Sequence, residues 1–352
     1  MHPDITVLIP TQDRHAKLSR ILKYLDGSGL KIKVFDSTAD SFEKLNDFPG
    51  IEYEHLPGKE LFIKNHDAVQ SVKTKFTVFC ADDDFIIPDG VKHCTEFLEE
   101  NHDYSCAQGN YISHRLVNRS VVYKPIYLNF IDANINMTSA ADRLVSYFSN
   151  YIQLFYAVHR ADSIKRVFSE GINKIKNYNL MELLVAGLSI INGKYKTIPV
   201  FYSSRESGTP SSSNETDSLE EISTSEKYKS EYASFLNSFA INLAEVDKVE
   251  PQVAAGIIQK ALQIYVERTM QRNTLTSGKS GDNANLRTAV KKIPYLGKQV
   301  LSKYDNTLGI KNLQKEGEQQ VEGLEGFPFD KTRNQAALNK IKELIKEIPI
   351  RE

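Results

Sequence analysis

The sequence FTVFCADDDFIIP, at residues 76–88, is the most informative segment of this chain. Its apolar, β-forming residues end abruptly in Asp82, Asp83 and Asp84, and Pro88 stands where a helix is expected to begin. A strand, a polar turn and a helix in this order are typical of one unit of a layered α/β protein. The segment therefore predicts a strand whose carboxyl end carries three adjacent carboxylates.

Further β-rich runs lie on both sides of this segment and alternate with helical patterns. They are residues 5–9, 32–35, 51–53, 104–108 and 198–202. Between the runs, apolar residues recur at helical spacing, as at Leu18, Ile21, Leu22 and Leu25. This alternation predicts an α/β sheet flanked by helices in the first 206 residues.

The composition changes after residue 206. Residues 207–227 are rich in Ser, Thr and Glu, which is typical of a linker or a mobile loop. From residue 228 to residue 352, apolar residues recur with a helical period, which predicts an all-α region. Packing of this region onto the first domain is the default expectation. A role as an acceptor platform, an oligomer interface or a peripheral membrane contact is left open.

Charge and cysteine content exclude several classes of protein. The 352 residues include 44 Lys and Arg against 45 Asp and Glu, so the basic excess of a nucleic-acid-binding protein is missing. Cys80, Cys94 and Cys106 lack zinc-type pairing, which indicates buried thiols in a reducing compartment. No stretch approaches the roughly 18 consecutive apolar residues of a membrane-spanning helix. We therefore expect a cytoplasmic protein without a transmembrane segment and without a nucleic-acid partner.

The acidic triplet suggests a metal site. In an extended chain the side chains alternate, so Asp82 and Asp84 would point the same way and grip a hard divalent cation. Mg²⁺ and Mn²⁺ are commonly held by one or two carboxylates together with phosphate oxygens of a substrate. A solvated acidic turn is the alternative, and the triplet by itself does not decide between the two.

Four stretches of the chain keep the order and spacing of a known family. They are ITVLIPTQDR at residues 5–14, VFDST at 34–38, FIKNHDAVQSVKTKFTVFCADDD at 62–84 and NLMELLVAGLSIINGK at 179–194. Over about residues 4–206 the chain resembles the family 2 type of glycosyltransferases, particularly a bacterial branch. The resemblance implies a GT-A-like, Rossmann-type mixed sheet, with the all-α region outside it.

The resemblance also implies an activity. It is inverting transfer of a sugar, assisted by Mn²⁺ or Mg²⁺, from a nucleoside diphosphate sugar to a hydroxyl group. The acceptor would be a glycan or a lipid-linked oligosaccharide in bacterial surface-polysaccharide synthesis. The protein would then work in the cytoplasm, with a peripheral contact at the cytoplasmic face of the inner membrane and a homo-oligomer left open.

Residue by residue, the resemblance assigns most of the site to donor binding. The positions that would contact the nucleotide and its diphosphate are Pro10, Thr11, Asp13, Arg14, Asp36, Lys64, Asn65, Asp82, Asp83 and Arg205, with Asp82 and Asp84 on the metal. Lys64 replaces the commoner arginine and lacks its bidentate fork. Each of three residues has a plain structural alternative: a helix cap for Asp13, an Asx turn for Asp36 and a surface position for Arg205.

Inverting transfer needs a base that takes the proton of the acceptor hydroxyl group. By resemblance Glu182, near the start of a helix, is the candidate, although Leu183 stands where the family commonly has a second acidic residue. A glutamate that complements the helix dipole is the structural alternative.

Two other functions stay open from the sequence. A nucleotidyltransferase would want a glycine-rich, basic loop after the first strand, but PTQDR at residues 10–14 has no glycine. A catalytically silent subunit that binds a sugar nucleotide or a glycan would keep the fold without turnover. The presence of both Glu182 and the acidic triplet favours the enzyme.

Overall fold

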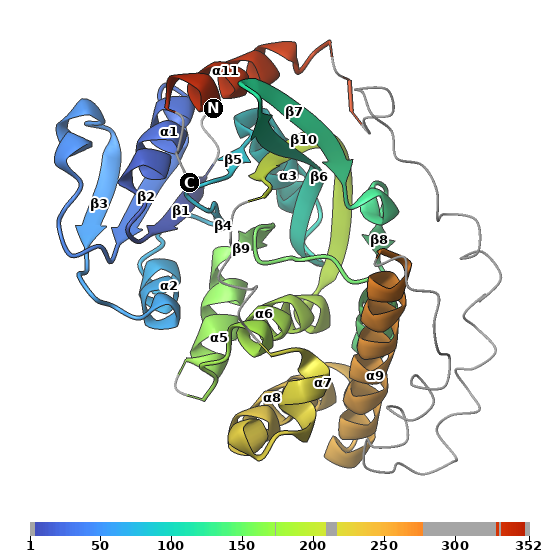
Figure 1. Ribbon diagram of the computed structural model, residues 1–352. Coiled ribbons are helices and arrows are strands. Elements are labelled where there is room, and N and C mark those ends of the chain that lie inside the picture. The colour runs from blue at the N-terminus through green and yellow to red at the C-terminus, as the bar shows by residue number, and fades with distance from the viewer. Residues whose placement is uncertain (1–3, 173, 209–216, 277–328, 331, 349–352) are drawn as a thin grey trace.

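A mixed β-sheet runs through the centre of the molecule (Figure 1). The structure, a computed structural model, describes residues 4–172, 174–208, 217–276, 329–330 and 332–348. The strands of this part are β1 (Ile5–Thr11), β2 (Lys31–Asp36), β3 (Ile51–His55), β4 (Phe76–Phe79), β5 (Phe85–Ile86), β6 (Tyr104–Val117), β7 (Ser120–Ile126), β8 (Asn134–Ile135), β9 (Val158–Arg160) and β10 (Lys194–Glu206). Their order is β3-β2-β1-β4-β9-β6-β10-β5, with β7 paired to β6 and β8 paired to β10.

The strand directions bring several strand ends to one edge of the sheet. Strands β3, β2, β1 and β4 are parallel to one another, and β9 is antiparallel to both β4 and β6. Each β-rich run of the sequence lies in β1, β2, β3, β4, β6 or β10, so the predicted α/β sheet is confirmed. The carboxyl edge of an open α/β sheet is where ligands bind.

Helices cover both faces of the sheet (Figure 1). They are α1 (His15–Leu25), α2 (Leu61–Gln70), α3 (Pro88–Glu100), α4 (Ala140–Ser149), α5 (Ala161–Gly171), α6 (Tyr178–Asn192), α7 (Leu219–Thr224), α8 (Lys229–Asp247), α9 (Pro251–Thr276) and α11 (Gln335–Glu347). Short 3-10 helices span Glu43–Asp47, Leu128–Phe130 and Glu226–Tyr228.

Strand side chains alternate between two hydrophobic cores. Leu8 of β1 belongs to the first core, whereas its neighbours Val7 and Ile9 belong to the second. In β4, Phe79 and Val78 are divided in the same way. Helices α2, α4, α5, α6, α8 and α9 contribute to the first core, and α1, α3 and α11 contribute to the second. Burial on both faces explains why these strands are almost continuously apolar.

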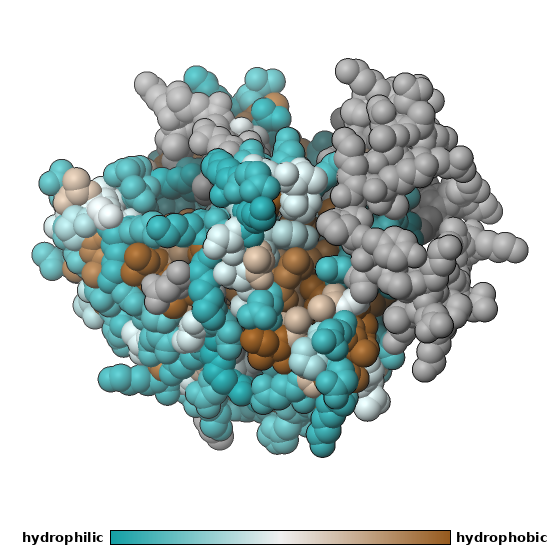
Figure 2. All heavy atoms as spheres, turned by 90° about the horizontal axis from the view of Figure 1, so that it is seen from below, coloured by the Kyte–Doolittle hydropathy of each residue, from teal (hydrophilic) through white to brown (hydrophobic). Residues whose placement is uncertain are grey.

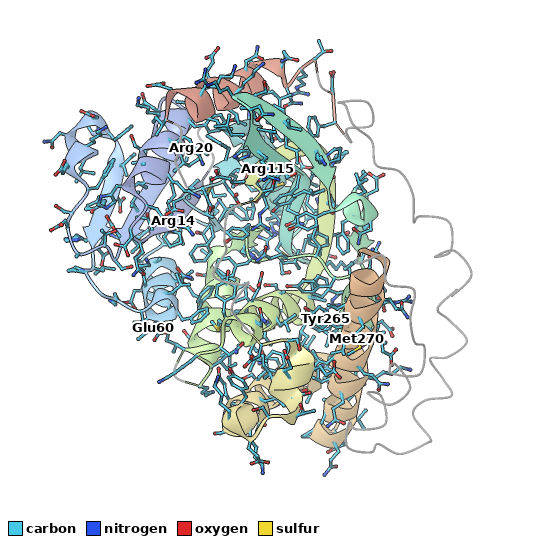
Figure 3. The ribbon with its side chains drawn as sticks, in the orientation of Figure 1. Arg14, Arg20, Glu60, Arg115, Tyr265 and Met270 are labelled. Carbon is cyan, nitrogen blue, oxygen red and sulfur yellow. The ribbon has the colours of Figure 1, made fainter. Side chains whose placement is uncertain are left out.

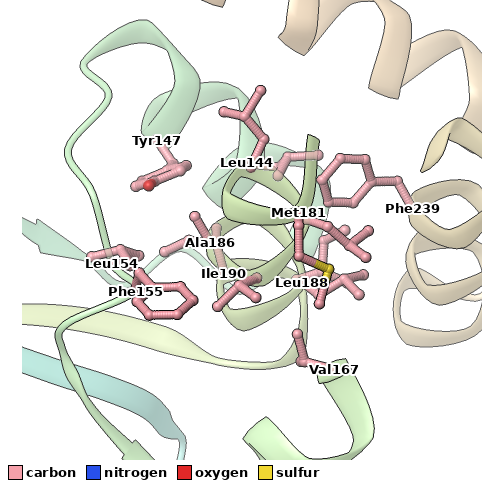
Figure 4. Packing of buried hydrophobic residues seen from close by; sticks show 14 of the residues in the cluster. Leu144, Tyr147, Leu154, Phe155, Val167, Met181, Ala186, Leu188, Ile190 and Phe239 are labelled. Carbon is pink, nitrogen blue, oxygen red and sulfur yellow. The ribbon is translucent and has the colours of Figure 1, made fainter. Parts of the chain in front are cut away.

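The C-terminal helices α8 and α9 share the first core with the sheet. Phe239 of α8 packs beside α6 (Figure 4), and a Cβ atom added to Gly187 would overlap with its ring. Asp247, at the end of α8, accepts the backbone N–H of Ala140 at 2.7 Å, at the start of α4. Helices α8 and α9, the described beginning of the helical region, therefore pack onto the first domain.

Helix α7 lies inside residues 207–227, which the composition predicts to be a linker. Ser218 and Glu221 form a capping box, and Leu219 and Ile222 are buried. The two apolar residues, spaced three apart behind a cap, are enough to form and anchor one short helix. The linker prediction is thus wrong for this part. Residues 209–216, and residues 277–328 of the predicted helical region, lie outside the described part of the chain.

Helix α11 returns to the N-terminal part of the chain and packs on α1. Its buried apolar side chains are Leu338, Ile341, Leu344 and Ile345. Lys340 donates a hydrogen bond to the carbonyl oxygen of Tyr24 at 2.8 Å and lies over the Tyr24 ring. The apolar face of this helix is thus used for internal packing, so it is not available for the membrane contact left open by the sequence.

The helical face below the sheet carries hydrophobic side chains among hydrophilic ones (Figure 2). On α8 and α9 the exposed large apolar side chains are Ile241, Val246 and Val253. Among the residues that the structure describes, no helix combines the length and the apolar character needed to cross a bilayer.

Arg143 of α4 is a buried cation that holds backbone carbonyls. Its guanidinium donates to the oxygens of Ile190 at 2.9 Å and Ile191 at 2.7 Å, in the last turn of α6. It also donates to Met137 at 2.9 Å and Thr138 at 2.8 Å. The cation therefore satisfies carbonyls that the end of α6 leaves without helical partners.

Replacement of Arg143 by Met is expected to lower the free energy of unfolding by about 3 kcal/mol, because buried carbonyl oxygens lose their donors. Urea unfolding followed by circular dichroism measures the change. The exposed Arg166 of α5 gives the matched control, and Arg166→Met should leave the midpoint nearly unchanged. Equal midpoints for the two variants would contradict the assigned role of Arg143.

Candidate active site

A cavity of about 690 Å³ opens at the edge of the sheet where β1 and β4 end. Every residue assigned to the site from the sequence lines it, with the exception of Asp36. The cavity has two chemically different halves. The charged half is formed by residues 10–14, 61, 64, 65 and 81–84 together with Glu206, and the tyrosine half by residues 127, 151–153, 155, 156, 178, 179, 182, 183 and 265. Arg205 joins them.

The turn after β1 is tied to the acidic turn after β4. The hydroxyl of Thr11 donates to Asp82 Oδ2 at 2.7 Å. Arg14 donates from Nη1 to Asp83 Oδ2 at 3.0 Å and to Asp82 Oδ1 at 3.3 Å. Because the Arg14 side chain is still 38% exposed, it remains open to an anionic ligand in the cavity.

Asp13 does not cap α1, although a cap is its structural alternative in the sequence. The N-terminal cap position is Arg14, without a side-chain cap hydrogen bond. Asp13 has a φ of 55°, in the left-handed region, and its N–H donates to the hydroxyl of Thr38 at 2.8 Å. Asp tolerates this backbone conformation better than most residues. Asp13 is thus free of the capping role and lines the cavity.

The three carboxylates of residues 82–84 lie in a turn, not in an extended strand. The Asp84 N–H donates to the carbonyl oxygen of Ala81 at 3.2 Å and closes the turn. The prediction of alternating side chains is therefore wrong, because it assumed that the strand continued through the triplet. Asp82 and Asp84 are at most 6% exposed and both line the cavity, so they still form a pair of carboxylates.

Cations surround the acidic turn on its far side. Lys17 lies 3.1 Å from Glu206 and 3.5 Å from Asp83. Arg20, which is 2% exposed, donates to Glu206 at 2.9 Å and to the backbone oxygen of Asp83 at 3.2 Å. The backbone N–H of Glu206 donates to Asp84 Oδ1 at 2.9 Å. This network fixes the turn against the end of β10, and the sequence did not reveal it.

The site chemistry fits a divalent cation completed by a substrate. Burial and the neighbouring Asp83 raise the pKa of Asp82 to about 6. Burial also raises the pKa of Asp84. A cation would relieve this mutual repulsion. Within the described ranges, no three His, Cys, Asp or Glu side chains could hold a metal ion together, so two carboxylates would need added oxygens, as Mg²⁺ and Mn²⁺ take from phosphates.

Lys64 and Asn65 lie on α2 at the floor of the charged half. The Lys64 ammonium donates to the carbonyl oxygen of Thr11 and to the hydroxyl of Ser37, each at 2.7 Å, and so joins the ends of β1 and β2. Burial lowers the pKa of Lys64 to about 8. Asn65 lines the cavity, and its buried Oδ1 atom has no hydrogen-bond partner, so it can serve as an acceptor for a ligand.

Asp36 is fully buried at the end of β2 and does not line the cavity. It accepts hydrogen bonds from Tyr53 at 2.7 Å and from the Thr38 N–H at 2.9 Å, and it pairs with His15 at 2.6 Å. The bond to Thr38 is the Asx turn given as its alternative. A direct contact between Asp36 and a nucleotide would need one of these partners to leave.

Glu182 lies in the second turn of α6 and faces the cavity from the tyrosine half. Burial raises its pKa from 4.5 to about 7, against an opposing effect of the Arg205 charge. A carboxylate with a pKa near neutrality is well matched to accept a proton. Asn177, whose side chain accepts the N–H of Leu180, caps this helix, and no acidic residue lies in its first turn, so Glu182 is not in the first-turn position of the helix-dipole alternative.

Arg205, near the end of β10, connects the two halves. It donates from Nε to Asp84 Oδ2 at 3.2 Å, and from Nη1 to the Tyr127 hydroxyl and to Gln153 Oε1, each at 2.9 Å. Its guanidinium also lies 5.2 Å from the centre of the Tyr156 ring. The surface-arginine alternative is therefore wrong, since Arg205 is held inside the site.

The tyrosine half contains residues that the sequence did not reveal. We call Tyr127, Tyr151, Tyr156, Tyr178 and Tyr265 the tyrosine wall. These residues come from distant segments, and Tyr265 belongs to α9, well apart from Arg14 in the view of Figure 3. Only Tyr178 had a usable signal, because it precedes Glu182 by one helical turn and shares its face.

No protein-family model and no curated protein sequence matches this chain. Among solved structures, S. aureus TarS 1-349 aligns with a TM-score of 0.51 and 14% identity, covering 78% of this chain and 75% of that chain. S. aureus TarS 1-349 in complex with UDP-GlcNAc aligns with a TM-score of 0.52 and 13% identity, covering 81% and 79%.

The fold is of the GT-A glycosyltransferase type. At such low identity the likeness concerns the fold alone, and it extends beyond the sheet into the C-terminal helices, as the coverage shows. The GT-A-like mixed sheet flanked by helices, which the resemblance implies, is confirmed. In this GT-A fold the acidic turn, Arg14 and Lys64 all lie at the carboxyl edge of the sheet, around one cavity.

Proposed function

We propose that this protein is an inverting, metal-dependent glycosyltransferase that moves a sugar from a nucleoside diphosphate sugar to a hydroxyl group. One observation carries the proposal: a single cavity at the carboxyl edge of a GT-A sheet holds both a charged half and a carboxylate of raised pKa. The acceptor would be a glycan or a lipid-linked oligosaccharide of bacterial surface-polysaccharide synthesis.

The charged half would bind the donor. Arg14 and Lys64 supply positive charge, and the free Oδ1 of Asn65 can accept a hydrogen bond from the nucleotide. Asp82 and Asp84 would hold Mn²⁺ or Mg²⁺, with the donor diphosphate as the remaining ligand. The complex of the structural neighbour TarS with UDP-GlcNAc supports a UDP-sugar as the donor class.

The catalytic step would use Glu182 as the base. Its carboxylate takes the proton of the acceptor hydroxyl as that oxygen bonds to the anomeric carbon from the face opposite the diphosphate. The bond from the anomeric carbon to the diphosphate oxygen breaks, and its electron pair leaves with the diphosphate. Arg205, which lines the cavity next to Asp84, would lie beside the departing group, and a bound divalent cation would supply further positive charge there.

The proposed setting is the cytoplasm, at the inner face of the bacterial membrane. The three free cysteines, Cys80, Cys94 and Cys106, are all buried, which is consistent with a reducing compartment. Membrane association and a homo-oligomer remain part of the proposal.

Binding of UDP should depend on a divalent cation. Titration calorimetry with Mn²⁺ or Mg²⁺ is expected to give saturable UDP binding that weakens at least about tenfold in EDTA, because two buried carboxylates then face the diphosphate uncompensated. Asp89 is exposed beyond the acidic turn, so Asp89→Asn should bind as the wild type does. Equal UDP affinity with and without metal would contradict the metal site.

A donor panel tests the enzyme against the silent binding subunit. Slow hydrolysis of one UDP-, GDP-, dTDP- or CMP-sugar by water, abolished by EDTA, would name the donor. Metal-dependent UDP binding without any hydrolysis would instead favour the binding subunit, since both functions need the charged half and only the enzyme needs turnover.

A further inference from the structure

The tyrosine half of the cavity differs in chemistry from the charged half. Phe155 and the tyrosine wall supply its aromatic rings, and Glu182 and Arg205 are its charged members among the described residues. Arg205 already has Asp84 as its counter-charge at 3.2 Å. A second anion in this half would therefore find no free cation and would meet the Glu182 carboxylate.

The wall is a fixed surface because it is anchored in the helical region. Tyr265 packs against Tyr151 with ring centres 5.0 Å apart and an interplanar angle of 74°. It also packs against Phe148 of α4 at 5.7 Å. Phe148 belongs to the first core together with residues of α8 and α9. The C-terminal helices thus contribute a side chain directly to the cavity.

Aromatic rings of this kind suit one class of ligand. The C–H faces of a sugar ring pack on flat aromatic surfaces, while tyrosine hydroxyls can hydrogen-bond to the hydroxyl groups at the sugar's rim. A phosphate or carboxylate group has no C–H face to pack on the rings, and although tyrosine hydroxyls could donate to it, its charge would be repelled by the Glu182 carboxylate. The wall is therefore matched to an uncharged sugar ring.

We infer that the tyrosine half is the acceptor subsite, that it takes an uncharged sugar residue, and that Tyr265 of α9 is a specificity-determining contact. This inference rests on the proposed glycosyltransferase function. A sugar stacked on the wall presents its hydroxyl group to Glu182, while the donor occupies the charged half across Arg205. The C-terminal helices would thereby select the acceptor.

The chain contains no tryptophan, so Tyr265→Trp introduces a single fluorophore in this subsite. The variant is titrated, with UDP and Mn²⁺ present, with the neutral trisaccharides chitotriose, maltotriose, cellotriose and mannotriose, and with anionic trigalacturonate. At least one neutral trisaccharide is expected to shift the emission saturably, and trigalacturonate is expected to have no effect. The control Tyr104→Trp, on β6 outside the cavity, should not respond to any of them.

A second variant is needed because the larger tryptophan side chain could itself disturb the packing around residue 265. Saturation-transfer NMR on the unmodified protein measures the affinity for the same trisaccharide, and Tyr265→Ala is expected to weaken it about tenfold, the value of one lost aromatic contact. The inference is overturned if no neutral trisaccharide binds, if trigalacturonate binds in their place, or if Tyr265→Ala leaves the affinity unchanged.

Calorimetry with UDP on the same samples distinguishes failure of the acceptor subsite from failure of the proposed transferase function. If UDP binds and no neutral trisaccharide does, the acceptor inference fails and the proposed function stands. If a neutral trisaccharide binds and UDP does not, the proposed transferase fails, and the tyrosine half remains a glycan-binding site.

Discussion

Asp84→Asn is expected to reduce donor turnover by about 10³-fold or more, because the amide removes a charge from the metal site and weakens the stabilisation of the leaving diphosphate. Asp84 is the buried carboxylate that Arg205 and the Glu206 N–H hold in place. An asparagine can keep one of these hydrogen bonds but leaves the Arg205 charge without its partner. Initial rates of sugar-nucleotide hydrolysis at fixed Mn²⁺ measure the effect.

Two comparisons make this expectation specific. The exposed Asp89 lies five residues further on, and Asp89→Asn should retain the wild-type rate, because it touches neither the cavity nor a cation site. Raising the Mn²⁺ concentration should partly restore Asp84→Asn if weakened metal binding is the cause. Unchanged turnover of Asp84→Asn at low Mn²⁺ would show that Asp84 is not a metal ligand.

The parts of the fold that could be predicted are those whose residues form a local pattern of apolar and polar side chains in the sequence. Strands β1 and β4 are continuous apolar runs because both faces of the sheet are covered, and such runs are visible in the sequence. Strand β9 has three residues and β5 has two, too few for a pattern of their own. They pair because neighbouring strands already exist, so only the assembled sheet reveals them.

The residues of the site also differ in whether local sequence patterns could predict their positions. Thr11 ends β1, Arg14 lies just after it, and Asp82 lies just after β4. Because β1 and β4 are parallel neighbours, their ends lie together, so the proximity of these residues could be predicted. The turn at residues 82–84 could not, because it depends on the Asp84 N–H turning back to Ala81. The tyrosine wall could not either, because Tyr265 reaches the cavity only through the packing of α9 on α4. Non-local packing leaves no periodic trace in a sequence.

Glu182→Gln is expected to reduce transfer to an acceptor by about 10²-fold to 10⁴-fold, the contribution of a positioned general base. The amide keeps the shape of the side chain but cannot take a proton, while UDP binding in the charged half should be unaffected. Exposed Glu245 of α8 provides the control, since Glu245→Gln should keep the wild-type rate.

The pH dependence of this variant distinguishes a base from a structural glutamate. Because burial raises the pKa of Glu182 to about 7, the wild-type kcat/KM should fall as the pH decreases below about 7, where the carboxylate becomes protonated. Glu182→Gln should lack this titration. The free energy of unfolding provides an independent check. Because folding raises the pKa of Glu182 from 4.5 to about 7, the wild type loses stability as the pH rises through this range. Glu182→Gln should therefore be at least as stable as the wild type at pH 8. A stable variant with a wild-type rate and pH profile would remove Glu182 from the catalytic step.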